Sequence, residues 1–238
     1  MAINKSVFRT RTLTAIVFAA VMLAGLFINM WSFIALCLLI AAGCLFEFLK
    51  IARRLGKKKY YLLMLISPFY ILMPMIMMMM LGITVLVATP GNARGQETIH
   101  TYYSPILPCA VILSIWINDT MAYIVGSLIG KTPFSKISPK KTWEGTIGGG
   151  IMCILIMGLL GYFLPAAHVL PFQNWIGIAV ICAIFAPIGD LLESKLKRMA
   201  GLKDSGSFMP GHGGFLDRFD SLLISLPFVW LYAELFIS

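Results

Sequence analysis

The chain has 238 residues, of which 59% are hydrophobic and only 12% are charged. Soluble domains are about 45–50% apolar and about 25% charged, so this composition excludes a disordered protein and most water-soluble domains. The excess apolar surface has to face lipid. The formal net charge of +9 is therefore better explained by membrane orientation and phosphate binding than by a nucleic-acid partner.

Seven apolar stretches are candidates to cross a bilayer core of about 30 Å as helices. In chain order they comprise residues 12–30, 31–49, 60–88, 104–129, 146–164, 175–194 and 221–237. The sequence thus predicts an all-α, polytopic membrane bundle of about seven helices. We divide it into N-terminal transmembrane helices, residues 1–100, and a C-terminal catalytic transmembrane region, residues 101–238.

Two boundaries are open in the sequence. Only Asn29 and its neighbours separate the first two stretches, which form either two full spans or a re-entrant hairpin. Residues 60–88 contain Pro68, Pro74 and Gly82, and are either one kinked helix or two short ones. The basic N-terminus resembles a signal peptide, but no clear cleavage site follows, so we expect an uncleaved first span.

The distribution of basic residues favours a single crossing for residues 60–88. With seven crossings, 18 of the 19 Lys and Arg residues lie in segments on one side, and Arg94 alone lies on the other. An eighth crossing would divide them almost equally. Because Lys and Arg are enriched in cytoplasmic loops, we expect the N-terminus and the basic loops in the cytoplasm and the C-terminus outside.

Most acidic residues fall on the same side. Seven of the ten carboxylates lie in or near two of these loops or in the spans leading into them: Asp119, Glu144, Asp190, Glu193, Asp204, Asp217 and Asp220. Such oxygen ligands favour magnesium or manganese over zinc. The neighbouring Lys and Arg side chains are suited to binding phosphate groups. Asp119 lies deep in its span, which predicts either a polar cavity that opens to the cytoplasm or an interhelical hydrogen bond with Asn118 or a hydroxyl.

The loop at residues 130–145 combines glycines with four lysines. Ser138 and Pro139 match the N-cap and first turn of a short helix, whose N–H groups would face an anion beside Lys140 and Lys141. The alternative is a basic loop that only touches anionic lipid headgroups.

Residues 189–221 are the most informative segment. Asp190, Ser194 and Lys197 share a helical face at the end of the sixth stretch. A glycine-rich loop with His212 follows, and Asp217 begins the next polar face. If the last two spans are neighbours, Asp190 and Asp217 both lie at the inner membrane boundary.

This segment resembles the signature of the phosphatidate cytidylyltransferase (CDP-diacylglycerol synthase) family. The pattern is carried by Ser194, Lys197, Arg198, Lys203, Asp204, Pro210, His212, Gly213, Gly214, Asp217, Arg218 and Asp220. WINDTMAYIVG at residues 116–126 and SPKKTWEG at residues 138–145 extend the resemblance upstream.

The resemblance implies a membrane enzyme that converts CTP and phosphatidic acid into CDP-diacylglycerol and pyrophosphate. It implies a magnesium ion held by Asp190 and Asp217, with a potassium ion beside it, and a homodimer. It places the enzyme in the cell inner (plasma) membrane, with its catalytic loops in the cytoplasm.

The expected site residues follow from the motifs and the resemblance together. Those expected to be catalytic are Asp190, Lys203, Asp204, His212, Asp217, Arg218 and Asp220; those expected to bind substrate are Asp119, Lys140, Lys141, Ser194, Lys197, Arg198, Gly213 and Gly214. The expected metal ligands are Asp190 and Asp217, aided by Asp220.

Two alternative functions are considered. A related CTP-dependent lipid enzyme, such as a polyprenol kinase or another CDP-lipid synthase, would release different products. A transporter, suggested by intramembrane Asp119 and the proline-broken helices, would show flux without CTP turnover.

Overall fold

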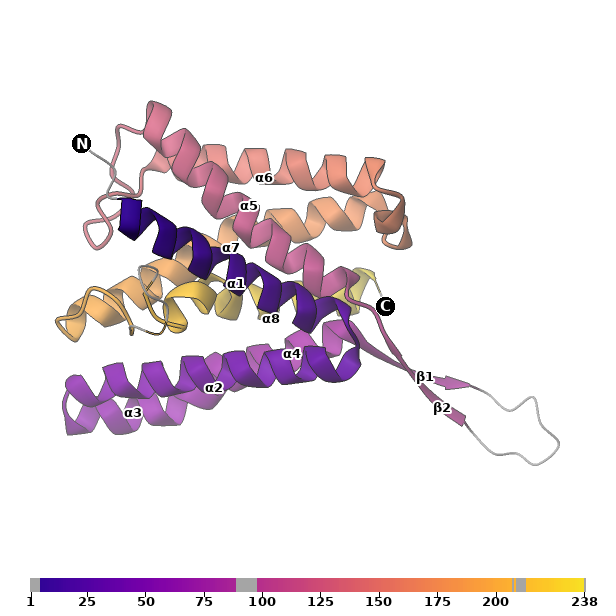
Figure 1. Cartoon of the computed structure of the whole chain (residues 1–238), viewed down its shortest axis with the longest axis horizontal. Coiled ribbons are helices and arrows are strands. Elements are labelled where there is room, and N and C mark those ends of the chain that lie inside the picture. Colours follow the sequence, from indigo (N-terminus) through magenta and orange to yellow (C-terminus); the bar gives the residue numbers. More distant parts are fainter. Residues whose placement is uncertain (1–4, 89–97, 207, 209–212, 238) are drawn as a thin grey trace.

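The computed structural model describes residues 5–88, 98–206, 208 and 213–237, with side chains from Thr12 to Ile83 and from Tyr102 onward within those ranges. The long helices run side by side along one direction (Figure 1). They are α1 (Lys5–Phe27), α2 (Met30–Arg54), α3 (Lys57–Ser67), α4 (Met73–Gly82), α5 (Ile106–Ile129), α6 (Trp143–Phe163), α7 (Phe172–Met199) and α8 (Leu216–Phe236).

The prediction of a polytopic helical membrane protein is confirmed. Six described helical runs are long and apolar enough to cross a membrane, and the apolar part of α1, Thr12–Phe27, is a shorter seventh. The turn between α1 and α2 is closed by a capping box. Asn29 Oδ1 accepts from Ser32 N (2.9 Å), and Asn29 N donates to Ser32 Oγ (3.0 Å). Residues 12–49 therefore form two separate antiparallel helices.

The third stretch is one continuous helical run, as the basic residues predict. A π-helical turn (Pro68–Leu72) joins α3 to α4, and the whole run from Lys57 to Gly82 has the length of a single span. A π turn accommodates a proline because it locally rearranges the backbone hydrogen bonds.

The prediction that residues 83–88 form the helical end of this stretch is wrong. Strand β1 (Ile83–Ala88) pairs with β2 (Thr98–Tyr103) in an antiparallel hairpin, with Ile83 opposite Tyr103. The β-branched residues of ITVLVA favour a strand over a helix. The hairpin projects from one end of the helical bundle (Figure 1).

The opposite end of the bundle gathers the basic segments. The start of α1, the α2–α3 turn, the α5–α6 loop and the α7–α8 loop all lie there, whereas the hairpin and the C-terminus lie at the far end (Figure 1). The core between the two ends is apolar and includes Phe33, Ile51, Val111, Met157 and Leu226, all fully buried. The charged and polar candidate residues are thus concentrated at one end of an apolar helical bundle.

Candidate active site

A close contact between α7 and α8 determines where the acidic residues meet. A Cβ atom at Gly189 would lie 2.5 Å from the Asp220 carbonyl oxygen, so only glycine allows the two backbones to approach this closely. Ser221 Oγ also donates to Ala186 O (3.1 Å) across the same contact. Asp190 follows Gly189 directly in the chain, and Asp220 is itself part of this contact. The two aspartates therefore belong to one local site.

Asp190 joins the α5–α6 loop to α7. Its Oδ2 forms an ion pair with Lys141, and its Oδ1 accepts from Ser194 Oγ (3.1 Å) one turn along the helix. About a third of the Asp190 side chain is accessible, so its oxygens can reach a ligand. Three predicted site residues, Asp190, Lys141 and Ser194, are therefore in direct contact.

Two further carboxylates lie near Asp190. Asp220 is buried, accepts from Ser221 N (2.6 Å) and interacts electrostatically with Asp190 and Asp119. Asp119 is exposed on α5 and interacts with Lys141, Asp190 and Arg218. The site thus draws carboxylates from α5, α7 and α8.

Asp217 has a different set of partners. Its Oδ1 pairs with Lys197, and its Oδ2 accepts from Ser205 N (2.9 Å) and Gly214 N (2.8 Å). Lys197 also pairs with buried Glu193, one turn back on α7. Asp217 therefore ties the α7–α8 loop to both helices, and Lys197 lies between two carboxylates rather than facing solvent.

Glu47 on α2 is a site residue that the sequence reasoning did not assign. It is buried, and its Oε2 accepts from Ser205 Oγ (2.6 Å) and Leu216 N (2.9 Å). A Cβ at Gly206 or Gly214 would lie 2.1 and 2.3 Å from the Glu47 oxygens, so both glycines leave room for this carboxylate. A lone acidic residue at the end of an apolar span is the signal that could have identified it.

The expected short helix at Ser138 is wrong. Residues 138–141 form a turn, in which Lys141 N donates to Ser138 O (3.1 Å), and α6 begins at Trp143 instead. Thr142 is the N-cap, since its hydroxyl accepts from Gly145 N (3.1 Å). Glu144 closes the loop by accepting from Thr132 N (3.1 Å). The loop places Lys141 against Asp190 without a helix N-terminus of its own.

The remaining predicted residues border this cluster. Lys140, Lys203, Asp204, Arg198 and Arg218 are exposed. Arg198 donates to Leu202 O (2.8 Å), which closes the end of α7. Gly213 has a positive φ of 88°, where a side chain would be strained, and His212 lies outside the described residues.

The donor set suits a hard cation. Within the part of the chain that the structure describes, no three His, Cys, Asp or Glu side chains form a group that encloses a metal by itself. Magnesium, however, usually binds one or two carboxylates together with water and substrate phosphates. The oxygens of Asp190 and Asp220, with Asp119 nearby, fit that requirement.

The arrangement combines two capabilities at the end of membrane-spanning helices. One or two of these carboxylates can bind a divalent cation together with water and substrate oxygens, and Lys141 and Arg218 can bind anionic oxygens beside it. Such a site suits transfer of a phosphorus-containing group to or from a molecule that is held in the bilayer.

Comparison with known proteins agrees with this chemistry. Residues 73–236 match the family model described as the cytidylyltransferase family. A phosphatidate cytidylyltransferase of Bacillus subtilis (strain 168) is 43% identical over 123 residues, which cover 51% of this chain and 45% of that protein. One from Staphylococcus aureus (strain COL) is 46% identical over 118 residues, covering 48% and 44%.

A plant protein extends the similarity to a longer segment. The protein named phosphatidate cytidylyltransferase 5, chloroplastic, of Arabidopsis thaliana is 38% identical over 159 residues. These residues cover 65% of this chain and 39% of the plant protein. The chain therefore matches less than half of the length of each of these three relatives.

Proposed function

The chain belongs to the cytidylyltransferase family, and we propose that it transfers a cytidylyl group from CTP to phosphatidic acid. A phosphatidate oxygen attacks the α-phosphorus of CTP, the bond from that phosphorus to the bridging oxygen breaks, and pyrophosphate leaves. The products are CDP-diacylglycerol and pyrophosphate. The names of the relatives support phosphatidate as the acceptor.

One observation carries the proposal more than any other. Asp190 forms an ion pair with Lys141 from one loop and lies within electrostatic range of Asp119 and Asp220 from two other helices, at the end of the bundle where the basic segments gather. Phosphatidate is anchored in the bilayer and CTP is soluble, so their phosphates meet at this boundary.

The residues have separate tasks in this reaction. Lys141 and Arg218 bind phosphate oxygens and orient the two reactants, and the attacking phosphatidate already carries an ionised oxygen, so no protein nucleophile is needed. Asp217, Lys197 and Glu47 hold the α7–α8 loop in place. Lys140, Lys203 and Arg198 are exposed nearby and add positive charge for the triphosphate.

Magnesium is the proposed cofactor, with Asp190 and Asp220 as the first candidate ligands because both lie at the α7–α8 contact. Asp190 would have to release Lys141, and Asp217 would have to release Lys197, before either could bind a cation. When bound, magnesium would neutralise the phosphates and stabilise the departing pyrophosphate. The family resemblance is the basis for adding a potassium ion.

We propose the cell plasma membrane as the location because two of the relatives are bacterial. We propose that the basic end is cytoplasmic, because 18 of the 19 Lys and Arg residues lie in segments at that end. We also propose a homodimer on the basis of the resemblance. Native mass spectrometry of the protein in detergent tests it, and a monomer as the single species would contradict it.

The decisive experiment uses the purified full chain with magnesium, a mixture of phosphatidic acid and a polyprenol, and CTP labelled at either the α- or the γ-phosphorus. We expect the α label in a lipid product and the γ label in pyrophosphate. Transfer of the γ label to a lipid alcohol would instead identify a kinase, and absence of CTP turnover would reject the enzyme assignment.

A further inference from the structure

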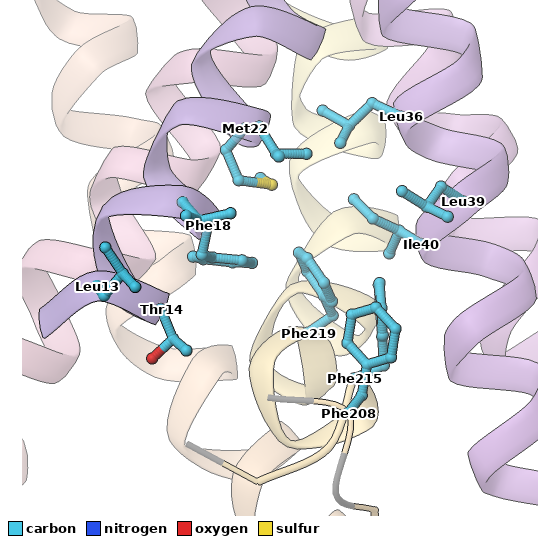
Figure 2. A pocket seen from close by; sticks show the side chains of 12 residues that line it. Leu13, Thr14, Phe18, Met22, Leu36, Leu39, Ile40, Phe208, Phe215 and Phe219 are labelled. Carbon is cyan, nitrogen blue, oxygen red and sulfur yellow. The ribbon is translucent and has the colours of Figure 1, made fainter. Parts of the chain in front are cut away.

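An apolar cavity of about 340 Å³ lies between α1, α2 and α8. Its lining includes Phe18 and Met22 of α1, Leu39 and Ile40 of α2, and Phe219 of α8 with the N-cap residue Phe215 (Figure 2). This volume is within the range of about 300–1,000 Å³ that is typical of ligand pockets. The cavity is large enough to hold part of a ligand, and its walls are almost entirely hydrocarbon.

The cavity is closed on the protein side and open on the lipid side. Met22 and Phe219 are only 1% and 3% exposed, whereas the lining residues Leu13 and Val17 are 61% and 55% exposed. Two of the three walls, α2 and α8, are long and apolar enough to span a membrane, and the third is the shorter apolar part of α1, so we expect the opening to face the lipid tails. A hydrocarbon chain can therefore enter from the bilayer without crossing water.

The inner wall of the cavity belongs to the same helical turns as the active site. Phe215 and Phe219 alternate with Asp217 and Asp220 along α8, so one side of these turns borders the cavity and the other borders the carboxylates. Phe219 also contacts Phe18 (5.9 Å between ring centroids), which closes the cavity against α1. A molecule in the cavity would thus contact the same turns of α8 that carry these carboxylates.

A second cavity, of about 380 Å³, continues the first toward the basic end. The two share Leu39, Phe208 and Phe215, and the second adds Glu47 and Lys50. The Glu47 carboxylate already accepts from Ser205 and Leu216, so Lys50 supplies the accessible charge at this opening. An apolar cavity with a cation at its charged end is complementary to an anionic lipid.

We propose that the cavity between α1, α2 and α8 binds one acyl chain of the phosphatidate substrate, with Lys50 attracting the anionic headgroup as the lipid enters. This inference rests on the proposed function and specifies how the lipid is held. The cavity makes the enzyme sensitive to acyl-chain length, because chain methylenes beyond the headgroup contribute to binding by burial.

The first test replaces a wall residue by a larger one. Val17→Trp fills the cavity, and Ile16→Trp is the matched control, because Ile16 is 60% exposed on the same helix but does not line the cavity. We expect Val17→Trp to lower kcat/KM for dioleoyl-phosphatidate by about tenfold or more, the effect of displacing roughly two buried methylenes. Dihexanoyl-phosphatidate turnover and the KM for CTP should change by less than about twofold.

Two outcomes of this test overturn the proposal. One is an unchanged rate with the long-chain lipid in Val17→Trp, and the other is an equal loss with both lipids. A loss in Ile16→Trp that matches the loss in Val17→Trp would also overturn it, since the effect would then not depend on the cavity.

A second test needs no catalysis and separates this inference from the proposed function. Phosphatidate with a photoactivatable diazirine in its acyl chain is crosslinked to the full chain without CTP, and the labelled peptides are identified by mass spectrometry. We expect labelling around Val17 and Leu39 that unlabelled phosphatidate suppresses and phosphatidylcholine does not. Even labelling that includes the exposed α6 residues Ile151 and Leu155 overturns the inference.

Failure of the two proposals gives different results. If the enzyme forms no CDP-lipid but the crosslink is localised and competed by phosphatidate, the reaction assignment fails and the lipid site stands. If CDP-lipid forms but labelling is even, the lipid site fails and the reaction stands.

Discussion

Glu47 Oε2 accepts a 2.6 Å hydrogen bond from Ser205 Oγ, although the two residues are 158 positions apart in the chain. The same oxygen accepts from Leu216 N (2.9 Å), and Ser205 Oγ in turn accepts from Asp217 N (3.3 Å). A carboxylate from α2 therefore connects the α7–α8 loop to the first turn of α8, where Asp217 lies. Helix α2 is thus part of the scaffold of the candidate active site.

Replacement of Glu47 should destabilise this connection. Glu47→Gln keeps the volume but weakens the acceptor of two buried donors, and we expect a loss of about 1–3 kcal/mol in the free energy of unfolding. Thermal unfolding in detergent measures it. A double-mutant cycle with Ser205→Ala should show coupling of about 0.5–3 kcal/mol, and additive effects would contradict the direct interaction.

Lys197 should be more important for stability than an exposed lysine on the same helix. Lys197→Met leaves the carboxylates of Glu193 and Asp217 buried without their shared cation, and breaking such a pair costs about 3–5 kcal/mol. Lys195→Met is the matched control, because Lys195 is exposed two residues earlier. Equal unfolding temperatures for the two variants would show that Lys197 does not bridge these groups.

Close packing of α5 against α6 predicts a position-specific effect of adding one methyl group. At Gly149 the new Cβ would lie 2.6 Å from the Ala122 backbone, which cannot move aside, whereas at Gly158 the nearest atom is 3.6 Å away. We expect Gly149→Ala to destabilise the protein by about 1–3 kcal/mol and Gly158→Ala to have little effect. Thermal unfolding compares the two variants. Because both glycines belong to α6, the general effect of Gly→Ala on helix stability is the same in each. Equal changes in the two variants would contradict this packing.

Magnesium dependence should be sensitive to Asp190. Asp190→Asn removes a ligand charge, and we expect cytidylyl transfer to fall by about 100-fold or more, with a higher magnesium concentration needed for half-maximal rate. Addition of EDTA should abolish the activity of the unaltered protein, and excess magnesium should restore it. Glu234→Gln, at the far end of α8, is the control and should keep the original magnesium profile. An unchanged magnesium profile in Asp190→Asn would exclude Asp190 as a ligand.

The sequence alone determined the features that depend on local pattern. Hydropathy over about 20 residues located the spans, and the basic residues predicted both the single crossing of the third stretch and the common end of the basic loops. The spacing of residues 194–221 identified the family, which the family match over residues 73–236 confirms. These features need no knowledge of how one helix is rotated against another.

Tertiary structure decided which side chains meet. Asp190 shares its surroundings with Asp119 and Asp220, while Asp217 pairs with Lys197 and the loop backbone. That division depends on the close approach of α7 and α8 at Gly189 and on the rotation of each helix, neither of which residue spacing specifies. The hydrogen bond between Glu47 and Ser205 could not be predicted from residue spacing. The two residues are 158 positions apart and meet only once the chain has folded.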